Sequence, residues 1–250
     1  MEARRVVPML WWLGSLLACS GGGGPAGGET IPLKEAKLNI EHNATDGDTG
    51  FQGAIDSEGW QNLDVKGPDG KVVLHLEGRG ALGSLGLTEL FFETVEPANV
   101  DVPIAEMIAV LPEGDYTISG KAMEDGESIG ETVGTAWLTH VIPAGPVLVS
   151  PTEGASVPAQ GLTVSWAPVT QTLTGGSVNI ISYQVIVEKD ELPHPHMIGK
   201  LGLSVYLPAS ASSLAVPDEF LEPSTPYQWE VLAIEESGNQ TLSSGSFQTQ

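Results

Sequence analysis

The sequence predicts an all-β protein made of two tandem β-sandwiches. Apolar and polar residues alternate in short runs, which is the pattern of strands with one buried face. The 250 residues include 31 glycines and 18 prolines, and these turn-forming residues recur between the runs. No long segment carries the period of an amphipathic helix. Because about 220 ordered residues exceed the roughly 100 residues of one small sandwich, we expect two domains.

The N-terminal residues 1–18 have the organisation of a secretory signal peptide. Arg4 and Arg5 provide the positive region, and an apolar run follows over residues 6–18. At about 1.5 Å per residue this run extends roughly 20 Å, which is less than the roughly 30 Å of a bilayer's hydrocarbon core. We therefore expect a cleaved signal and not a transmembrane helix.

The signal ends in Leu16-Leu17-Ala18-Cys19, which resembles the lipobox of bacterial lipoproteins. The resemblance implies cleavage before Cys19 and acylation of the new N-terminal cysteine, so Cys19 is the predicted lipid anchor. Cys19 is also the only cysteine of the chain, and a lone thiol in an exported protein cannot form an intramolecular disulfide. The alternative is an ordinary cleaved signal with a cysteine nearby, or a buried core cysteine.

Residues 19–30 carry the glycine-rich stretch that follows this cysteine. Glycine loses more backbone entropy on ordering than other residues, so we expect a flexible tether here. In lipoproteins of diderm bacteria, an aspartate after the cysteine commonly causes retention in the inner membrane. Ser20 stands at that position, and the resemblance therefore implies a lipid-anchored protein of the bacterial cell envelope, in the outer membrane.

The first folded domain is predicted over residues 31–142 as an immunoglobulin-like β-sandwich of no recognised family. Tyr116 and Trp137 are the large side chains around which we expect its core to pack. A short helix is expected over residues 102–110, ahead of Pro112. Strands are expected where apolar residues alternate with polar ones, at residues 38–40, 72–77, 116–122 and 133–141.

A second domain is predicted over residues 146–250, after a turn-rich segment at residues 142–146. Alternation places Leu162, Val164 and Trp166 on one face of an early strand. Residues 183–188 repeat the alternation, so we expect a second sandwich with its own core.

Residues 221–233 begin with leucine, proline, threonine and tyrosine at the spacing of a tyrosine corner, with Tyr227 as the tyrosine. Together with Trp166 and a final strand at residues 245–249, this segment resembles a fibronectin type III domain. The resemblance implies that the Tyr227 hydroxyl bonds back to the turn and that Trp166 lies in the core. A different immunoglobulin-like sandwich is the alternative. The chain has no Arg-Gly-Asp tripeptide, so a spacer or a protein-contact surface is the expected role.

The charge of the chain excludes several classes of partner. Ten Lys and Arg residues stand against 32 Asp and Glu residues, a formal net charge of −22, which becomes −23 when residues 1–18 are removed. Nucleic acids and anionic lipid surfaces are bound through clustered basic residues, so no nucleic-acid partner is expected. The acids are spread along the chain and are interpreted as a solvated surface.

Residues 78–83 fit the glycine pattern of a dinucleotide-binding loop and follow an apparent strand. Such a site also needs a helix, for which residues 84–95 are the candidate, and an acid, for which Asp101 is the candidate. The flanking sequence lacks the Val/Ile-rich parallel strands of a βαβ unit. We therefore interpret the loop as a crossing between sheets and predict no cofactor.

Residues 43–50 resemble the first half of a calcium loop. Measured from Asp46, an EF-hand needs an acid or amide at about position five and a glutamate at about position twelve, where this chain has Gly50 and Ser57. Asp and Gly as turn formers explain the stretch, and calcium binding by Asp46 and Asp48 is the alternative.

The histidines do not assemble a predicted site. His194 and His196 lie between prolines and have no third ligand nearby in the sequence, so no metal ligands are predicted. His42, His75 and His140 are far apart in the sequence, and no G-x-S-x-G elbow accompanies them, so no catalytic residues are predicted.

These patterns favour a non-enzymatic binding, adhesion or assembly module with a protein or glycan of the envelope as partner and the first domain as binder. One alternative is a glycan-active envelope enzyme that uses acidic residues of that domain, and another is a calcium-stabilised structural protein. Trp60, Phe91 and Phe92 are the aromatic residues that would line a glycan cleft, but in a small sandwich we expect them in the core.

Overall fold

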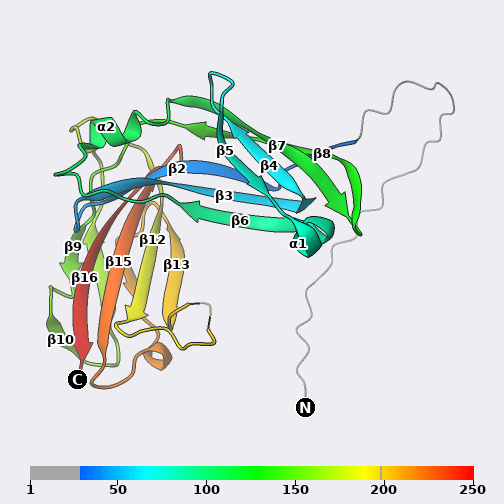
Figure 1. Cartoon of the computed structure of the whole chain (residues 1–250). Helices are drawn as coiled ribbons and strands as arrows, with labels where there is room; N and C mark the ends of the chain where they lie inside the picture. The colour runs from blue at the N-terminus through cyan, green and yellow to red at the C-terminus, as the bar shows by residue number, and fades with distance from the viewer. Residues whose placement is uncertain (1–28, 198) are drawn as a thin grey trace, which may run out of the picture.

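The computed structural model describes residues 29–250 except Ile198, and it contains two β-sandwiches that meet at a corner (Figure 1). The strands of the N-terminal sandwich run across the end of the C-terminal sandwich. The predicted signal peptide, the predicted anchor Cys19 and the tether up to residue 28 lie outside the described residues. No described helix is both long and apolar enough to cross a membrane.

The N-terminal sandwich consists of two sheets. One sheet contains β2 (Glu35–Asn43), β3 (Asp48–Trp60) and β6 (Leu87–Glu93), paired antiparallel in that order. The other contains, in order, β1 (Glu29–Pro32), β8 (Glu127–Leu138), β7 (Gly114–Glu124), β4 (Asn62–Lys66) and β5 (Val72–Glu77).

The C-terminal sandwich also consists of two sheets. The smaller one has the order β14 (Ser213–Ala215), β11 (Thr163–Ala167) and β9 (Val147–Ser150). The larger one contains, in order, β13 (Gly202–Pro208), β12 (Ile180–Lys189), β15 (Pro226–Glu235) and β16 (Gln240–Thr249), and β10 (Ala155–Val157) pairs with β16.

Both sandwiches have the same strand order. When β1 and β10 are left out, each sandwich has seven strands. The first, second and fifth form one sheet, which is β2, β3 and β6 in the N-terminal sandwich and β9, β11 and β14 in the C-terminal one. The third, fourth, sixth and seventh form the other sheet, which is β4, β5, β7 and β8 in the N-terminal sandwich and β12, β13, β15 and β16 in the C-terminal one. The predicted all-β fold of two tandem immunoglobulin-like sandwiches is therefore confirmed. Each sandwich has its own cluster of buried apolar residues, which follows from the alternation of its strands.

The core of the N-terminal sandwich contains Trp60 and Tyr116, which are 2% and 0% exposed. The prediction that Trp137 belongs to this core is wrong, because 55% of its surface is exposed. Its neighbours Ala136 and Leu138 on β8 are buried. Since successive side chains of a strand point to opposite faces, burial of these neighbours turns Trp137 outward.

The helix expected over residues 84–95 is wrong, because only residues 84 and 85 of this segment are helical. A helix, α1 (Gly80–Leu85), occupies the glycine loop, and the strand β6 follows it. Within β6, Leu90 and Phe92 pack against the core, so the period of the segment is that of a strand. The preceding strand β5 pairs antiparallel with β4, and a parallel βαβ unit is therefore missing from the described residues around the loop. The short helix predicted over residues 102–110 is present as α2 (Ile104–Ile108).

Both sandwiches contain a tyrosine corner. The hydroxyl of buried Tyr227 accepts a bond of 2.8 Å from the Glu222 N–H and donates to the Phe220 carbonyl, at the end of the 3₁₀ turn η1 (Asp218–Phe220), at 3.3 Å. This is the geometry that the fibronectin type III resemblance implies. The hydroxyl of Tyr116 donates to the Pro112 carbonyl at 2.8 Å, a second corner that was not predicted from the sequence.

We expect Tyr227→Phe and Tyr116→Phe each to lower the free energy of unfolding by about 1–2 kcal/mol, with the larger loss at Tyr227, where a backbone N–H also loses its acceptor. Urea denaturation measures this loss. Tyr206→Phe is the control, because Tyr206 is 67% exposed, and its effect should lie within about 0.5 kcal/mol of zero. Equal stability of all three variants would contradict a structural role for the corners.

The two sandwiches share one continuous sheet. Residues 240–242 of β16 pair in parallel with residues 41–43 of β2, and the Ala44 N–H extends this pairing to the Leu242 carbonyl at 2.9 Å. The strands β6, β3, β2, β16, β15, β12 and β13 are therefore neighbours in this order across the domain boundary. The sheet bends where β2 meets β16, and this bend is the corner seen in Figure 1.

Asn239 holds this junction together from the loop before β16. Its side-chain oxygen accepts the Ile40 N–H at 2.8 Å, and its amide nitrogen donates to the carbonyls of Thr139 and Val141 at 2.9 and 2.8 Å. Asn239 is fully buried, so these bonds form without competition from water. One side chain thus joins β2, the segment between the sandwiches and the second sandwich.

Candidate functional site

The bend in the shared sheet creates a groove of about 670 Å³ on its concave side, which we call the corner groove. On β2 the odd-numbered residues face it, because Leu38 and Ile40 point into the core. All strands of the bent sheet contribute to its lining. The lining residues are Glu35, Lys37, Asn39, Glu41, Gln52, Ala54, Phe91, Glu93, Ile181, Ser182, Gln184, Ile186, Tyr206, Glu230, Leu232, Ile234, Gly238, Gln240 and Leu242.

Exposed aromatic side chains gather at this groove. Phe91 and Tyr206 line it and are 64% and 67% exposed. Trp137 lines an adjoining hollow that shares Ile181 and Lys37 with the groove. Among the described residues, these are the exposed aromatic side chains, so the aromatic surface that the protein presents to solvent is concentrated at the corner.

The placement of the predicted aromatic residues differs from one to another. Trp60 is buried and Phe92 packs against the core, as expected. The prediction that Phe91 is a core residue is wrong. Phe92 follows it on β6 and points inward, so the alternation of the strand turns Phe91 into the groove.

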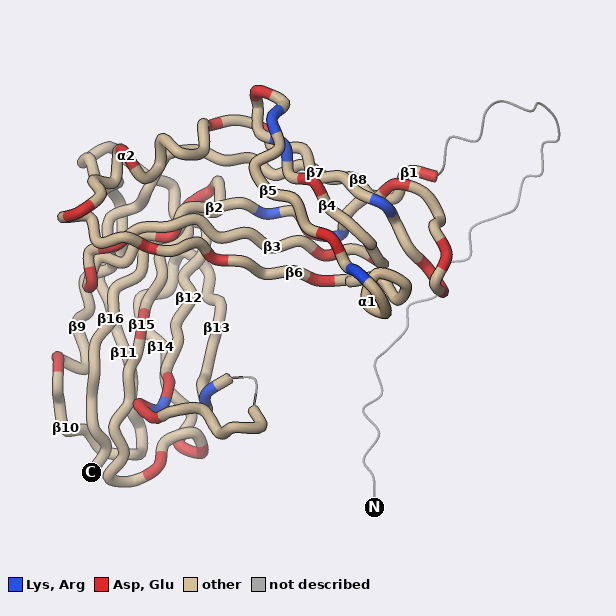
Figure 2. Tube along the Cα trace, viewed as in Figure 1, with Lys and Arg blue, Asp and Glu red and all other residues tan. Residues whose placement is uncertain are grey.

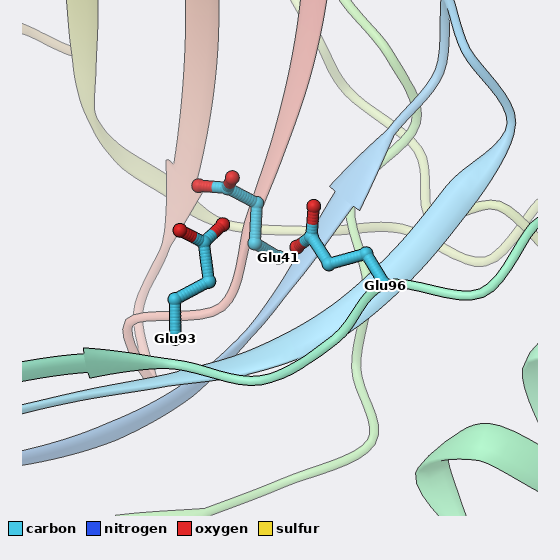
Figure 3. Close-up of side chains that lie close together, drawn as sticks. All are labelled: Glu41, Glu93 and Glu96. Atoms are coloured by element: carbon cyan, nitrogen blue, oxygen red, sulfur yellow. The ribbon is translucent and has the colours of Figure 1, made fainter.

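Three carboxyl groups meet at one end of the groove. Glu41 comes from β2, Glu93 from the end of β6, and Glu96 from the segment that follows it, and they form what we call the glutamate cluster (Figure 3). One carboxylate oxygen from each lies within 4.8 Å of the others. Glu41 is 7% exposed, and its carboxylate accepts a hydrogen bond from the Gln240 amide of the second sandwich.

Burial raises the pKa of two carboxyl groups of this cluster, those of Glu96 and Glu41. Burial, followed by the charges of Glu93, Glu41 and Asp48, raises the pKa of Glu96 to about 7. Burial also raises the pKa of Glu41, although hydrogen bonds from the Gln240 and Gln52 amides oppose the shift. One oxygen of Glu96 and one of Asp48 are buried without a hydrogen-bond partner.

Glu230 extends the acidic floor of the groove onto β15. Burial, followed by the charge of Glu188, raises the pKa of its carboxyl group. The corner groove therefore combines an acidic floor with aromatic side chains at its margin. Such a surface can bind a cation, hold a proton, or hydrogen-bond a polar ligand that stacks on the aromatic rings.

The glutamate cluster supplies oxygen ligands of the kind that calcium prefers, but only three of the roughly six to eight that calcium takes. Within residues 29–250 it is also the one group of three or more side chains spaced for a metal ion, and neither Asp46 nor Asp48 belongs to it. Asp46 lies in the turn between β2 and β3, where its carboxylate accepts a bond from the Asn43 amide at 3.0 Å. The interpretation of this stretch as a turn agrees with that geometry.

The histidines lie in separate surroundings. The rings of His194 and His196 are 5.5 Å apart in an exposed loop. His42 bonds to Thr49 at 3.0 Å, His75 pairs with Asp64 at 2.6 Å, and His140 contacts the carbonyl of Leu111. The structure does not bring the last three together.

The glutamate cluster, Glu230 and Tyr206 were not predicted from the sequence. Glu41, Glu93 and Glu230 come from distant parts of the chain, so no spacing between them carries a signal. Acidic residues are also spread over both sandwiches (Figure 2), and composition cannot single out these few. The one available signal was the pair Phe91 and Phe92, because adjacent strand residues cannot both point inward. The groove is lined by both sandwiches, so the first domain does not form it alone.

No protein-family model and no curated protein matches the chain. By their strand order and tyrosine corners, both sandwiches have a fibronectin type III-like fold. Similar solved structures include a two-domain fibronectin type III segment from chicken tenascin, at 16% identity and a TM-score of 0.30 over 87% of this chain and 99% of that one.

Two further solved structures are similar at lower identity. The FN1–FN3 domains of chicken CNTN1 match at 12% identity and a TM-score of 0.31, over 88% of this chain and 65% of that one. A tetra-tandem repeat from the extending region of a large adhesion protein matches at 11% identity and a TM-score of 0.29, over 86% of this chain and 50% of that one.

Proposed function

We propose that this protein is a non-enzymatic binding module of the bacterial cell envelope, which holds a protein or glycan partner in the corner groove. The observation that supports this most is the gathering of the exposed aromatic side chains, because Phe91 and Tyr206 line the groove and Trp137 lines the adjoining hollow. Exposed aromatic surface has a cost in solubility, and in soluble proteins it concentrates where partners bind.

The junction between the sandwiches favours such a role. Pairing of β16 with β2 and the buried Asn239 hold the two walls of the groove in one arrangement. A groove that is already formed binds with a smaller loss of conformational entropy than one assembled by its ligand. The module therefore presents a preorganised surface rather than two independent domains.

Attachment to the membrane through a lipid on Cys19 is part of the same proposal. We expect Cys19→Ser to move the protein from the membrane pellet to the soluble fraction and to abolish labelling with radioactive palmitate, because stable anchoring needs the attached acyl chains. Ser20→Ala is the control and should leave both properties unchanged. A Cys19→Ser protein that stays in the pellet after a high-salt wash would contradict lipid anchoring.

Binding at the groove can be tested without knowing the partner. We propose screening the full-length protein in mild detergent against a glycan array and a displayed library of random peptides. Ligands of the wild-type protein should lose binding to the Phe91→Ala/Tyr206→Ala variant. The Val100→Ala/Leu192→Ala variant removes apolar side chains that are even more exposed and lie outside the groove, and it should bind as the wild type does. If no ligand depends on Phe91 and Tyr206, the groove is not the binding site.

The glutamate cluster supports a second candidate function, that of a glycan-active hydrolase. A glycosidase needs a protonated acid beside a second carboxylate. A pKa of about 7 suits Glu96 to the first role, and an oxygen of Glu41 and one of Glu93 lie within 4.8 Å of it for the second. Release of reducing ends from peptidoglycan or from chromogenic glycosides measures such turnover. Activity that is lost in Glu96→Gln and kept in Glu89→Gln, a matched change on β6, would favour the enzyme over the binding module.

A further inference from the structure

The side chains that line the corner groove carry more negative than positive charge. The Lys37 ammonium pairs with Glu35 at 2.7 Å, so these two residues neutralise each other. Glu41, Glu93 and Glu230 also line the groove, and none of them forms an ion pair with a described Lys or Arg residue. The groove therefore carries an excess of three carboxyl groups on its floor, and Glu96 adds a fourth beside them.

Apolar surface stands next to this acidic floor. Phe91 on β6 and Tyr206 on β13 come from the two edge strands of the bent sheet, and Ile181, Ile186 and Leu232 lie between. A ligand in the groove thus meets carboxylates and apolar side chains within one hollow of about 670 Å³, a size typical of sites that take several side chains or a small molecule.

We propose that the corner groove binds an extended, cationic and apolar polypeptide segment of a partner protein, with an arginine side chain on Glu41, Glu93 and Glu230 and flanking apolar side chains on Phe91 and Tyr206. The inference rests on the proposed binding function and adds the chemistry of the ligand. It is carried by charge complementarity, because a cation compensates carboxylates that are partly withdrawn from water.

Arginine fits this surface better than other cations. Its planar guanidinium group forms two parallel hydrogen bonds with a carboxylate and also stacks on aromatic rings, so it can use the floor and the margin together. A neutral glycan would bury the same carboxylates without a counter-charge. A calcium ion would neutralise charge in the glutamate cluster, but it would find only three of its ligands there and would leave the aromatic margin without a partner.

The test uses three fluorescent peptides and the full-length protein in mild detergent. The probes are an eight-residue peptide of alternating arginine and leucine, the same peptide with glutamine for arginine, and the same peptide with glutamate for arginine. Fluorescence anisotropy at 150 mM NaCl gives Kd. We expect the arginine peptide to bind at least about tenfold more tightly than the glutamine peptide, and the glutamate peptide not to bind.

Because the whole protein is acidic, the decisive comparison uses variants of equal charge. Glu41→Gln/Glu230→Gln should weaken binding of the arginine peptide about tenfold, as should Phe91→Ala/Tyr206→Ala. Glu124→Gln/Glu127→Gln removes the same charge at the exposed β7–β8 turn and should change Kd less than about twofold. Thermal melts of each variant establish that it is folded.

Five results would overturn the inference. An equal loss in the control variant would mean unspecific charge attraction, and displacement of the arginine peptide by micromolar calcium would mean a metal site. The glutamine peptide could bind as tightly as the arginine peptide, or a glycan could bind, with either binding still dependent on Phe91 and Tyr206. Such a result would leave the proposed binding function in place and would remove only the cationic ligand. If no ligand of any class depends on the groove, the proposed function fails with it.

Discussion

Replacement of Asn239 by alanine is expected to lower the free energy of unfolding by about 3 kcal/mol. The alanine leaves the Ile40 N–H and the carbonyls of Thr139 and Val141 without their partner at a fully buried position. Each buried polar group that loses its hydrogen bond costs about 1–3 kcal/mol, and water cannot easily replace the missing amide.

The same substitution should also change the form of the unfolding curve. In the wild type the parallel pairing of β16 with β2 couples the two sandwiches, so we expect one cooperative transition in urea. Without Asn239 the coupling weakens, and two transitions are expected, one for each core. Tryptophan fluorescence reports both cores, because Trp60 lies in one and Trp166 and Trp229 in the other.

A matched control separates the junction from a general effect of losing an amide. Asn179 is exposed, and its amide donates to Glu236 at 3.0 Å. Asn179→Ala should therefore change stability by less than about 0.5 kcal/mol and keep a single transition. If Asn239→Ala behaves in the same way, the bonds of Asn239 do not hold the junction.

Stability is expected to fall as the pH rises from about 5 to about 8. Glu96 has a pKa of about 7 in the folded protein against an ordinary value of 4.5, and the pKa values of Glu41 and Glu230 are raised as well. Between the unfolded and folded pKa values the folded state holds protons that the unfolded state has released. The stabilisation from protonation is therefore full at low pH and is lost as the pH rises through the folded pKa.

The Glu96→Gln variant tests this dependence directly. The uncharged amide removes the repulsion from Glu93, Glu41 and Asp48, so we expect Tm at pH 8 to rise by roughly 3–6 °C, which corresponds to about 1–2 kcal/mol. This value is below the full pKa shift because the Glu96 carboxyl is partly open to water. At pH 5 the variant and the wild type should have nearly equal Tm values.

Glu89→Gln is the control for this experiment. Glu89 is an exposed residue on β6 outside the glutamate cluster, and the variant carries the same change in net charge. Its Tm should follow the wild type at both pH values. A rise at pH 8 as large as that of Glu96→Gln would assign the pH dependence to the net charge of the protein instead of to the cluster.

The sequence by itself determined the class of fold and the features that are local in the chain. Strand alternation around Trp166 lies within a short segment, so its side-chain directions follow from a period of two. The tyrosine corner at Tyr227 was predictable because residues 221–233, which run into β15, resemble the corresponding segment of fibronectin type III domains. The predictions for Trp137 and Phe91 failed because each residue was assigned to the wrong face of its strand. A shift of one residue exchanges the buried and exposed faces of a strand.

The groove was decided by the tertiary structure alone. Its two walls belong to different sandwiches, and they face each other because the first residues of β16 pair with β15 on one side and with β2 on the other. Backbone hydrogen bonds make that pairing. Because backbone groups are the same in every strand, no local pattern of residues predicts it. Glu41, Glu93 and Glu230 come to line one groove only through this pairing, and burial there raises the pKa of Glu41 and of Glu230.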